Sequence, residues 1–314
     1  MKPHVLFLVG PTACGKSRIG GFLAEALRGE IVSADSMLVY RGMDVLTAKP
    51  SEADRQRVRH HLIDVVSPQE TFSVFDYYRA AASAISQISS RGALPLVVGG
   101  TGLYVRSLLR GLSAAPGPDL RLRSQLENEA QDPEPLYQRL MGLDPVRAKQ
   151  IQPKDRKRII RALEIAMAAS GNSGPESLFS KHACPSLAEM GFDPLVLGLR
   201  KDRTLLYRHI EARVESMFLT GLADEVSRLS AEGVSKTASQ ALGYKELLMS
   251  LRNEISPADA KDLIKLNTRR FAKRQETWFR REPVRRWFEI QDGETPEVTA
   301  QAILDWYRSQ NLPF

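Results

Sequence analysis

The chain has 314 residues, of which 43% are hydrophobic and 26% charged, proportions typical of a globular protein of about two domains. They exclude a disordered or fibrous chain, and no apolar run approaches the roughly 18 residues that span a bilayer. Two cysteines, Cys14 and Cys184, are too few for a disulfide framework or a four-ligand zinc site. We therefore expect a cytoplasmic protein with no membrane partner.

The net charge of +7 is concentrated in one segment near the carboxyl end of the sequence. Between Lys265 and Phe288 there are nine basic residues and two acidic ones, whereas the rest of the chain has 35 of each. A basic block on an otherwise neutral chain is typical of a protein that binds a polyanion such as nucleic acid. A solvated basic helix is the alternative that this pattern leaves open.

Strands and helices alternate in the first third of the chain. Apolar runs predict buried strands at 5–9, 30–35 and 95–101 and a further strand at 61–66. Helical periodicity predicts helices at 18–28 and 73–90, the second with Ser73 as its N-cap. This alternation favours an α/β fold with a parallel sheet.

The pattern changes after Gly111. It becomes helical as far as Ser170, and strand-like residues return at 195–199. We therefore predict a first core part at 1–115, a mostly helical insertion domain at 116–194, and a return to the core with basic helices at 195–314. An exposed loop rich in glycine, proline and serine is expected at 171–185, and a last strand at 284–290.

Residues 10–17 match the phosphate-loop (P-loop) pattern G-x-x-x-x-G-K-S/T, directly after a predicted strand and before a predicted helix. In such loops the glycines let backbone N–H groups surround phosphate oxygens, and the helix amino end adds partial positive charge. Lys16 is suited to the terminal phosphate and the Ser17 hydroxyl to Mg²⁺. The predicted phosphate-binding residues are Gly10, Pro11, Thr12, Ala13, Cys14, Gly15, Lys16 and Ser17.

The rest of the core is unusual for a nucleotide-hydrolysing protein. Such proteins hold Mg²⁺ with an acid at the end of a neighbouring strand, but two glycines and Thr101 follow Val98. Asp35 is the one acid at a predicted strand end and could be a metal-shell ligand or a general base. Asp64 lies inside an apolar run, which favours a structural role.

Several segments resemble the tRNA dimethylallyltransferase (isopentenyltransferase) family, in that family's order and over nearly the whole chain. They are the phosphate loop and the segments 33–44, 47–50, 96–104, 155–164, 240–245 and 273–280. The resemblance implies transfer of a dimethylallyl group from dimethylallyl diphosphate to N6 of the adenosine immediately 3′ of the tRNA anticodon. The P-loop would then hold a diphosphate leaving group instead of ATP, with Mg²⁺ as cofactor.

The resemblance also implies roles for single residues. Lys16, Arg213 and a Mg²⁺ ion near Ser17 would stabilise the leaving diphosphate. Asp35 would take the N6 proton, and Thr101 would hydrogen-bond the bridging oxygen. The protein, expected to be a monomer, would hold the anticodon stem-loop through Asp35, Ser36, Met37, Leu38, Thr101, Arg123, Lys157, Arg158, Ile159, Ile160, Arg161, Gln240, Ala241, Leu242, Gly243, Tyr244, Lys245, Lys273, Arg274, Gln275, Glu276, Thr277, Trp278, Phe279 and Arg280.

Two alternatives belong to other functional classes. The P-loop alone is also consistent with an ATP-binding kinase or ATPase that acts on or binds RNA. An RNA-binding regulator with a vestigial loop is disfavoured by the intact Lys16, Ser17 and Asp35. For Trp278, its spacing of seven residues from Phe271 favours a core position over a platform for base stacking.

Overall fold

The computed structural model describes residues 2–113, 117, 119–129, 132–169 and 182–310. The chain forms two compact units: unit 1 comprises 1–110 and 187–314, and unit 2 comprises 111–186. Unit 2 falls at the place of the predicted insertion, with both of its ends a few residues earlier. One reason is that the Leu187 N–H donates to Leu108 O at 2.9 Å, so the returning chain rejoins unit 1 before the predicted boundary at 194.

Unit 1 is built on a parallel six-stranded sheet in the order β3-β2-β4-β1-β7-β8. The strands are β1 (His4–Val9), β2 (Gly29–Ser33), β3 (His60–His61), β4 (Leu94–Gly99), β7 (Asp193–Lys201) and β8 (Arg286–Ile290). The central strands are continuous apolar runs because helices cover both faces of the sheet. The predicted α/β fold and five of the six predicted strands are confirmed, with shifted ends.

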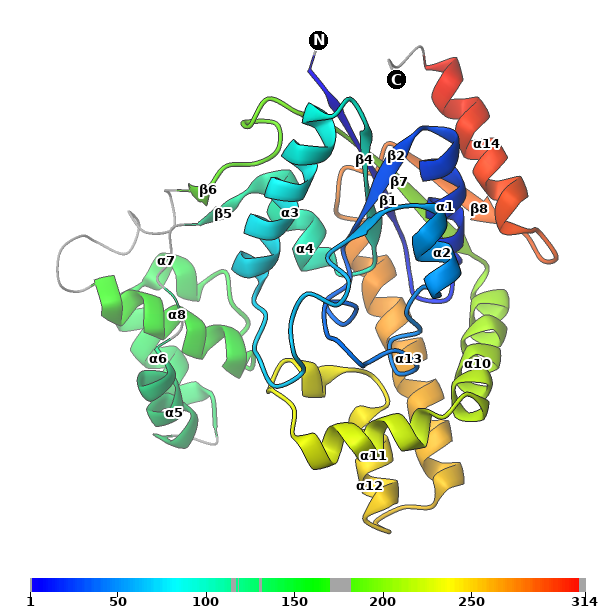
Figure 1. Ribbon diagram of the computed structural model, residues 1–314. Helices are drawn as coiled ribbons and strands as arrows, with labels where there is room; N and C mark the ends of the chain where they lie inside the picture. Colours follow the sequence, from blue (N-terminus) through cyan, green and yellow to red (C-terminus); the bar gives the residue numbers. More distant parts are fainter. Residues whose placement is uncertain (1, 114–116, 118, 130–131, 170–181, 311–314) are drawn as a thin grey trace. The chain divides into compact units, whose positions relative to one another are not determined.

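Helices cover the two faces of this sheet (Figure 1). On one face α1 packs against α14, and α3 packs beside α4 on the other. The side chain and backbone of Ser73 form a capping box with Asp76, which confirms the predicted N-cap. The bounds of these helices, with that of the short α2, are α1 (Lys16–Ala26), α2 (Glu52–Arg57), α3 (Val74–Ser90), α4 (Gly102–Arg110) and α14 (Pro296–Ser309).

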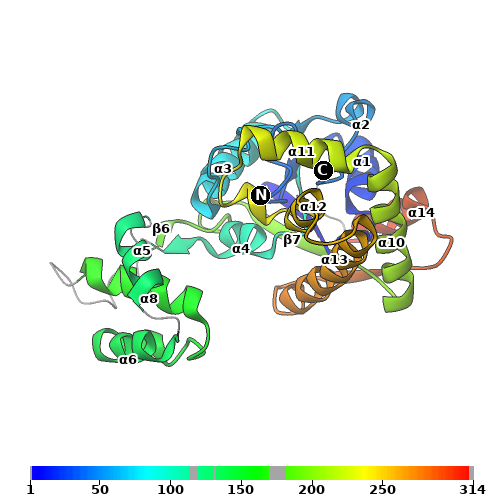
Figure 2. The same cartoon turned by 90° about the horizontal axis from the view of Figure 1, so that it is seen from below.

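The remaining helices of unit 1 lie beyond the carboxyl ends of the strands. Most of them lie beneath the sheet in Figure 1 and toward the viewer in Figure 2. They enclose a second hydrophobic core, in which Val39, Tyr40 and Met43 pack against Val214 and Ile264. These elements are α10 (Arg203–Leu219), α11 (Leu222–Glu232), η1 (Ala238–Gln240), α12 (Tyr244–Leu251) and α13 (Pro257–Phe279).

The strand predicted at 61–66 is wrong, because β3 ends at His61. Leu62 and Asp64 have positive φ values of 64° and 57°, which break the extended backbone that pairs with β2. The Asp64 carboxylate pairs with Lys49 and accepts from Arg55 at 2.8 Å. The structural role predicted for Asp64 is therefore confirmed.

Unit 2 is mostly helical, as predicted. It contains β5 (Leu112–Ser113), α5 (Leu120–Glu129), α6 (Glu134–Leu143), α7 (Pro145–Ala148), α8 (Arg156–Ala169) and β6 (His182–Cys184). Most of the loop predicted at 171–185 lies outside the described residues, and its end forms β6, antiparallel to β5. Among the described residues of the whole chain, no helix has the length and apolar character needed to cross a membrane.

Candidate active site

The P-loop connects β1 to α1 at the carboxyl edge of the sheet. Gly10 has a φ of 155°, and a Cβ there would lie 2.5 Å from Leu199 O, so only glycine fits. Gly15, with φ 92°, turns the chain into α1, whose first residue is Lys16. The Lys16 ammonium donates to Pro11 O at 2.7 Å across the loop. The loop therefore presents a cation and the amino end of a helix at one place.

The turns that follow β2 and β4 are joined beside this loop. The Thr101 N–H donates to Ala34 O and the Ser36 N–H to Thr101 Oγ1, each at 3.0 Å. The Asp35 carboxylate accepts from the Met37 N–H at 2.9 Å, which fixes its orientation. Because β2, β4 and β1 are adjacent and parallel, their carboxyl ends bring Asp35 and Thr101 close to the P-loop.

A cavity of about 330 Å³ lies at this edge. Lys16, Ser17, Asp35 and Arg213 all line it, and its apolar lining includes Leu38. Ligands of open α/β sheets bind outside the carboxyl ends of the strands, which is where this cavity lies. The structure therefore brings together a phosphate loop, a carboxylate and a second cation.

Arg213 reaches the cavity from α10, far along the chain. Its guanidinium donates to Thr47 O at 3.1 Å. Burial lowers the pKa of Arg213, and the nearby Asp35 opposes that shift. Such a half-buried guanidinium is suited to an anionic ligand, because little water competes for its N–H groups.

Comparison with known proteins identifies the family. A family profile described as IPP transferase matches residues 38–282. The chain belongs to the IPP transferase family. The tRNA dimethylallyltransferase of Pelotomaculum thermopropionicum is 44% identical over 306 residues, which cover 96% of each chain.

Solved structures of IPP transferases agree with this assignment. The full-length tRNA isopentenylpyrophosphate transferase of Bacillus halodurans aligns with a TM-score of 0.70 at 35% identity, covering 99% of this chain and 98% of that one. A eukaryotic dimethylallyltransferase acting on tRNA aligns with a TM-score of 0.80 at 25% identity, covering 99% and 81% of the two chains. The family predicted from the sequence is confirmed.

Some residues that line the site of this IPP transferase were not predicted from the sequence. His209 and Phe271 line the cavity from α10 and α13. His209 Nδ1 lies 2.8 Å from the Lys201 ammonium, and burial followed by the charge of Lys201 lowers the pKa of His209. Its position one helical turn before Arg213 was the signal that could have indicated it.

The residues predicted to contact tRNA on unit 1 divide by exposure. One group is buried and comprises Leu38, Ala241, Gly243, Tyr244, Gln275 and Phe279. Another is exposed and comprises Gln240, Lys245, Lys273, Arg274, Thr277 and Arg280. The half-buried group is Asp35, Ser36, Met37, Thr101, Leu242, Glu276 and Trp278. The exposed group is the part of the prediction whose side chains are open to a macromolecule.

Trp278 has mainly packing contacts. A Cβ on Gly102 would lie 2.3 Å from its ring, and the Arg106 guanidinium lies 4.1 Å from the ring centroid. The packing role that its spacing favours agrees with these contacts.

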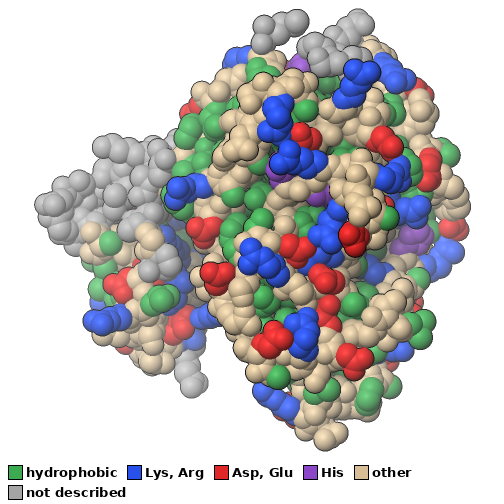
Figure 3. Space-filling view, viewed as in Figure 1, with side chains coloured by type: hydrophobic (Ala, Val, Ile, Leu, Met, Phe, Trp, Pro, Cys, Tyr) green, Lys and Arg blue, Asp and Glu red, His purple; other side chains and the backbone are tan. Residues whose placement is uncertain are grey.

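Part of the basic block is neutralised inside unit 1. Lys265 pairs with Glu215 at 2.5 Å and Arg269 with Glu211 at 2.6 Å, which links α13 to α10. The charge counted from the sequence of this block is therefore larger than the charge that a bound polyanion would meet. On the face drawn in Figure 3, basic and acidic side chains are interspersed.

The predicted tRNA-contact residues of unit 2 lie on α5 and α8. Arg123 donates two hydrogen bonds, at 2.8 and 2.7 Å, to the buried Glu164. Ile159 and Ile160 belong to the hydrophobic core of this unit, whereas Lys157 and Arg158 are exposed. Arg161 also donates to Glu164, at 3.1 Å. Lys157 and Arg158 are therefore the members best placed for a ligand.

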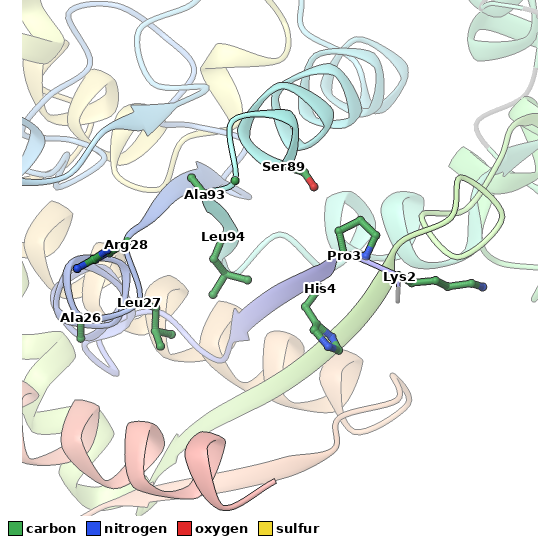
Figure 4. Close-up of a pocket in the computed structure, with 10 residues that line it drawn as sticks. Lys2, Pro3, His4, Ala26, Leu27, Arg28, Ser89, Ala93 and Leu94 are labelled. Atoms are coloured by element: carbon green, nitrogen blue, oxygen red, sulfur yellow. The ribbon is translucent and has the colours of Figure 1, made fainter. Parts of the chain in front are cut away.

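Two further observations concern where else on the described residues a ligand could bind. Among the described residues, no cluster of three His, Cys, Asp or Glu side chains could hold a metal ion. A larger cavity of about 580 Å³ lies at the amino ends of the strands, lined by residues that include His4, Leu27 and Leu94 (Figure 4). None of the motif residues lines it, and the candidate site is the cavity that Lys16, Asp35 and Arg213 line together.

Proposed function

We propose that the chain is a tRNA dimethylallyltransferase, which moves the dimethylallyl group of dimethylallyl diphosphate to N6 of the adenosine immediately 3′ of the anticodon. The observation that carries this proposal is the one cavity that a P-loop cation, a carboxylate and a half-buried arginine line together. A diphosphate on the loop would leave its allylic carbon near Asp35. The names of the relatives support the same reaction.

The cations act on the leaving group. As the bond between the allylic carbon and the bridging oxygen breaks, negative charge grows on the diphosphate. Lys16 and Arg213 line the cavity, where they stabilise that charge without a reorganisation of water. The Thr101 hydroxyl, which contacts Ser36, is proposed to turn toward the bridging oxygen.

Asp35 acts on the nucleophile. The lone pair of an adenine amine is delocalised, so N6 attacks the allylic carbon well only if a base removes its proton. The N6–carbon bond forms as the carbon–oxygen bond breaks, the proton passes to Asp35, and diphosphate leaves. The target base must leave its stack to enter a cavity at the strand ends.

Mg²⁺ is the proposed cofactor, with the Ser17 hydroxyl as its protein ligand. The donor set fits, because Mg²⁺ usually takes few protein oxygens and shares substrate phosphate oxygens. Ser17 lies at the first turn of α1 and lines the same cavity as Lys16. The ion would supply further positive charge for the leaving diphosphate.

The anticodon stem-loop is the proposed RNA partner. On unit 1, the exposed side chains of Lys245, Lys273, Arg274 and Arg280 are suited to phosphate contacts. Phosphate contacts position an RNA but do not read its sequence. Hydrogen bonds between the protein and the base held in the cavity select the nucleotide. The residues of unit 2 are proposed to contribute in the same way.

The test is a direct incubation of the protein with tRNA, Mg²⁺ and either dimethylallyl diphosphate or ATP. The proposal expects prenylated adenosine, detected by mass spectrometry of nuclease digests, and inorganic pyrophosphate in equal amount. Replacement of the target adenosine by guanosine is the matched control and should abolish transfer. Release of phosphate from ATP without prenylation would instead favour the kinase or ATPase alternative.

A further inference from the structure

The Gln275 side chain connects the two halves of the candidate site. It projects from α13, and only 7% of Gln275 is exposed. Its Oε1 accepts from the Thr12 N–H at 2.8 Å, and its Nε2 donates to Gly100 O at 2.9 Å. Both polar atoms of the amide are therefore used, each on the backbone of a different loop.

The contact with Thr12 controls the direction of one peptide group. The N–H of Thr12 and the carbonyl of Pro11 belong to the same planar peptide and point in opposite directions. That carbonyl accepts from the Lys16 ammonium at 2.7 Å. By holding the N–H, Gln275 fixes the carbonyl that positions the lysine cation.

The contact with Gly100 controls a second peptide group in the same way. The carbonyl of Gly100 and the N–H of Thr101 share one peptide, and that N–H donates to Ala34 O at 3.0 Å. Ala34 directly precedes Asp35. Gln275 therefore also holds the peptide that ties the Thr101 turn to the Asp35 turn.

An amide is the group that this place requires. It combines a donor and an acceptor on one planar end, whereas an ionised glutamate has acceptors alone and methionine has no strong donor or acceptor. The fit is tight, because a Cβ on Gly100 would lie 2.3 Å from Gln275 Nε2. A buried amide with both atoms paired is also more costly to replace than an exposed one.

We propose that Gln275 is a positioning residue that sets the Lys16 ammonium on the diphosphate side and the Thr101–Asp35 turns on the base side. The proposal rests on the proposed function and differs from the tRNA contact expected for Gln275 from the sequence. Lys273 and Arg274, its exposed neighbours on α13, keep the tRNA role. The same helix thus contributes to RNA binding on its outer face and to alignment on its inner face.

The experiment compares Gln275→Met with Lys273→Met, a matched substitution two residues away. Binding of Mg²⁺-pyrophosphate is measured by calorimetry and binding of the anticodon stem-loop by fluorescence anisotropy. Gln275→Met should weaken pyrophosphate binding about tenfold or more and leave stem-loop affinity within about twofold. Lys273→Met should do the reverse.

A double-variant cycle tests whether Gln275 acts through Lys16. In a Lys16→Met background, Gln275→Met should cost much less pyrophosphate affinity than it does alone. If Gln275→Met does not fold, Gln275→Glu keeps the size and the Thr12 acceptor but lacks the donor to Gly100. It should lower kcat for prenyl transfer with little change in the KM for tRNA.

The outcomes separate this proposal from the proposed function. Unchanged pyrophosphate affinity in Gln275→Met, or an equal loss in the presence and absence of Lys16, would overturn the positioning role alone. A loss of stem-loop affinity equal to that of Lys273→Met would return Gln275 to direct tRNA contact. A wild-type protein that binds pyrophosphate but does not prenylate tRNA would contradict only the proposed function.

Discussion

Glu225 is expected to hold the loop that forms one wall of the cavity. Its carboxylate accepts three backbone N–H groups, from Asp44 at 2.8 Å, Val45 at 2.9 Å and Leu46 at 2.8 Å. The next two residues, Thr47 and Ala48, line the cavity. Replacement of Glu225 by alanine should therefore loosen this wall.

The size of the effect follows from the three contacts. A hydrogen bond to a charged group contributes about 1.5–3 kcal/mol when it is protected from water. These N–H groups are exposed or half-buried, so we take about 1 kcal/mol for each and about 3 kcal/mol in total. Local opening of the loop should then become roughly 100-fold more frequent.

Hydrogen exchange measures this opening. The amides to follow are those of Ala48 and Lys49, which donate to Val45 O at 3.0 Å and Asp44 O at 2.9 Å and do not contact Glu225. Glu232→Ala, on the same helix, is the control: Glu232 makes an exposed pair with Arg228 at 3.3 Å and should change exchange less than about threefold. If the exchange rates of the Ala48 and Lys49 amides rise less than about threefold in Glu225→Ala as well, Glu225 does not hold this loop.

Asp35→Asn should lower the single-turnover rate about 10²–10⁴-fold with pyrophosphate affinity retained, and rescue by raised Mg²⁺ would instead make Asp35 a metal ligand. Lys273→Met should reduce the magnitude of the slope of log tRNA affinity against log salt by about 1. Lys265→Met should leave that slope unchanged, because the Lys265 ammonium is already paired with Glu215. Hydrogen bonds from Lys261 and Lys265 lower the pKa of Glu215 from 4.5 to about 2. The contribution of the Glu215 carboxylate to the stability of the folded protein is therefore full above about pH 4.5 and is lost as the pH falls toward 2. The acid unfolding curves of wild type and Glu215→Gln should accordingly converge near pH 2.

The sequence was sufficient to predict those elements that have a distinctive local pattern of residues. Continuous apolar runs identify buried strands, and the P-loop pattern between a strand and a helix predicts a phosphate site. Asp35 and Thr101 follow such strands, so a parallel sheet alone places them at one edge. The prediction of a strand at 61–66 was wrong for a local reason. The backbone turns at Asp64, which has a positive φ, and the Asp64 carboxylate pairs with Lys49 and Arg55.

The sequence was insufficient where one side chain pairs with a distant backbone. Gln275 and Thr12 are 263 residues apart, and no periodicity relates them. The same limit applies to charge, since the sequence counts Lys265 and Arg269 as free cations although Glu215 and Glu211 neutralise them. Burial and partners on other elements, which only the fold determines, decide which predicted tRNA contacts are open.

The two helices that complete the site are also fixed to each other. Arg213 lies on α10 between Glu211 and Glu215, and both of these carboxylates pair with basic residues of α13. Gln275 lies further along α13, where it holds Thr12 and Gly100. A shift of α13 would therefore move the arginine and the P-loop peptide together. Because transfer depends on the distance between a leaving group and a nucleophile, this shared support affects both halves of the reaction at once.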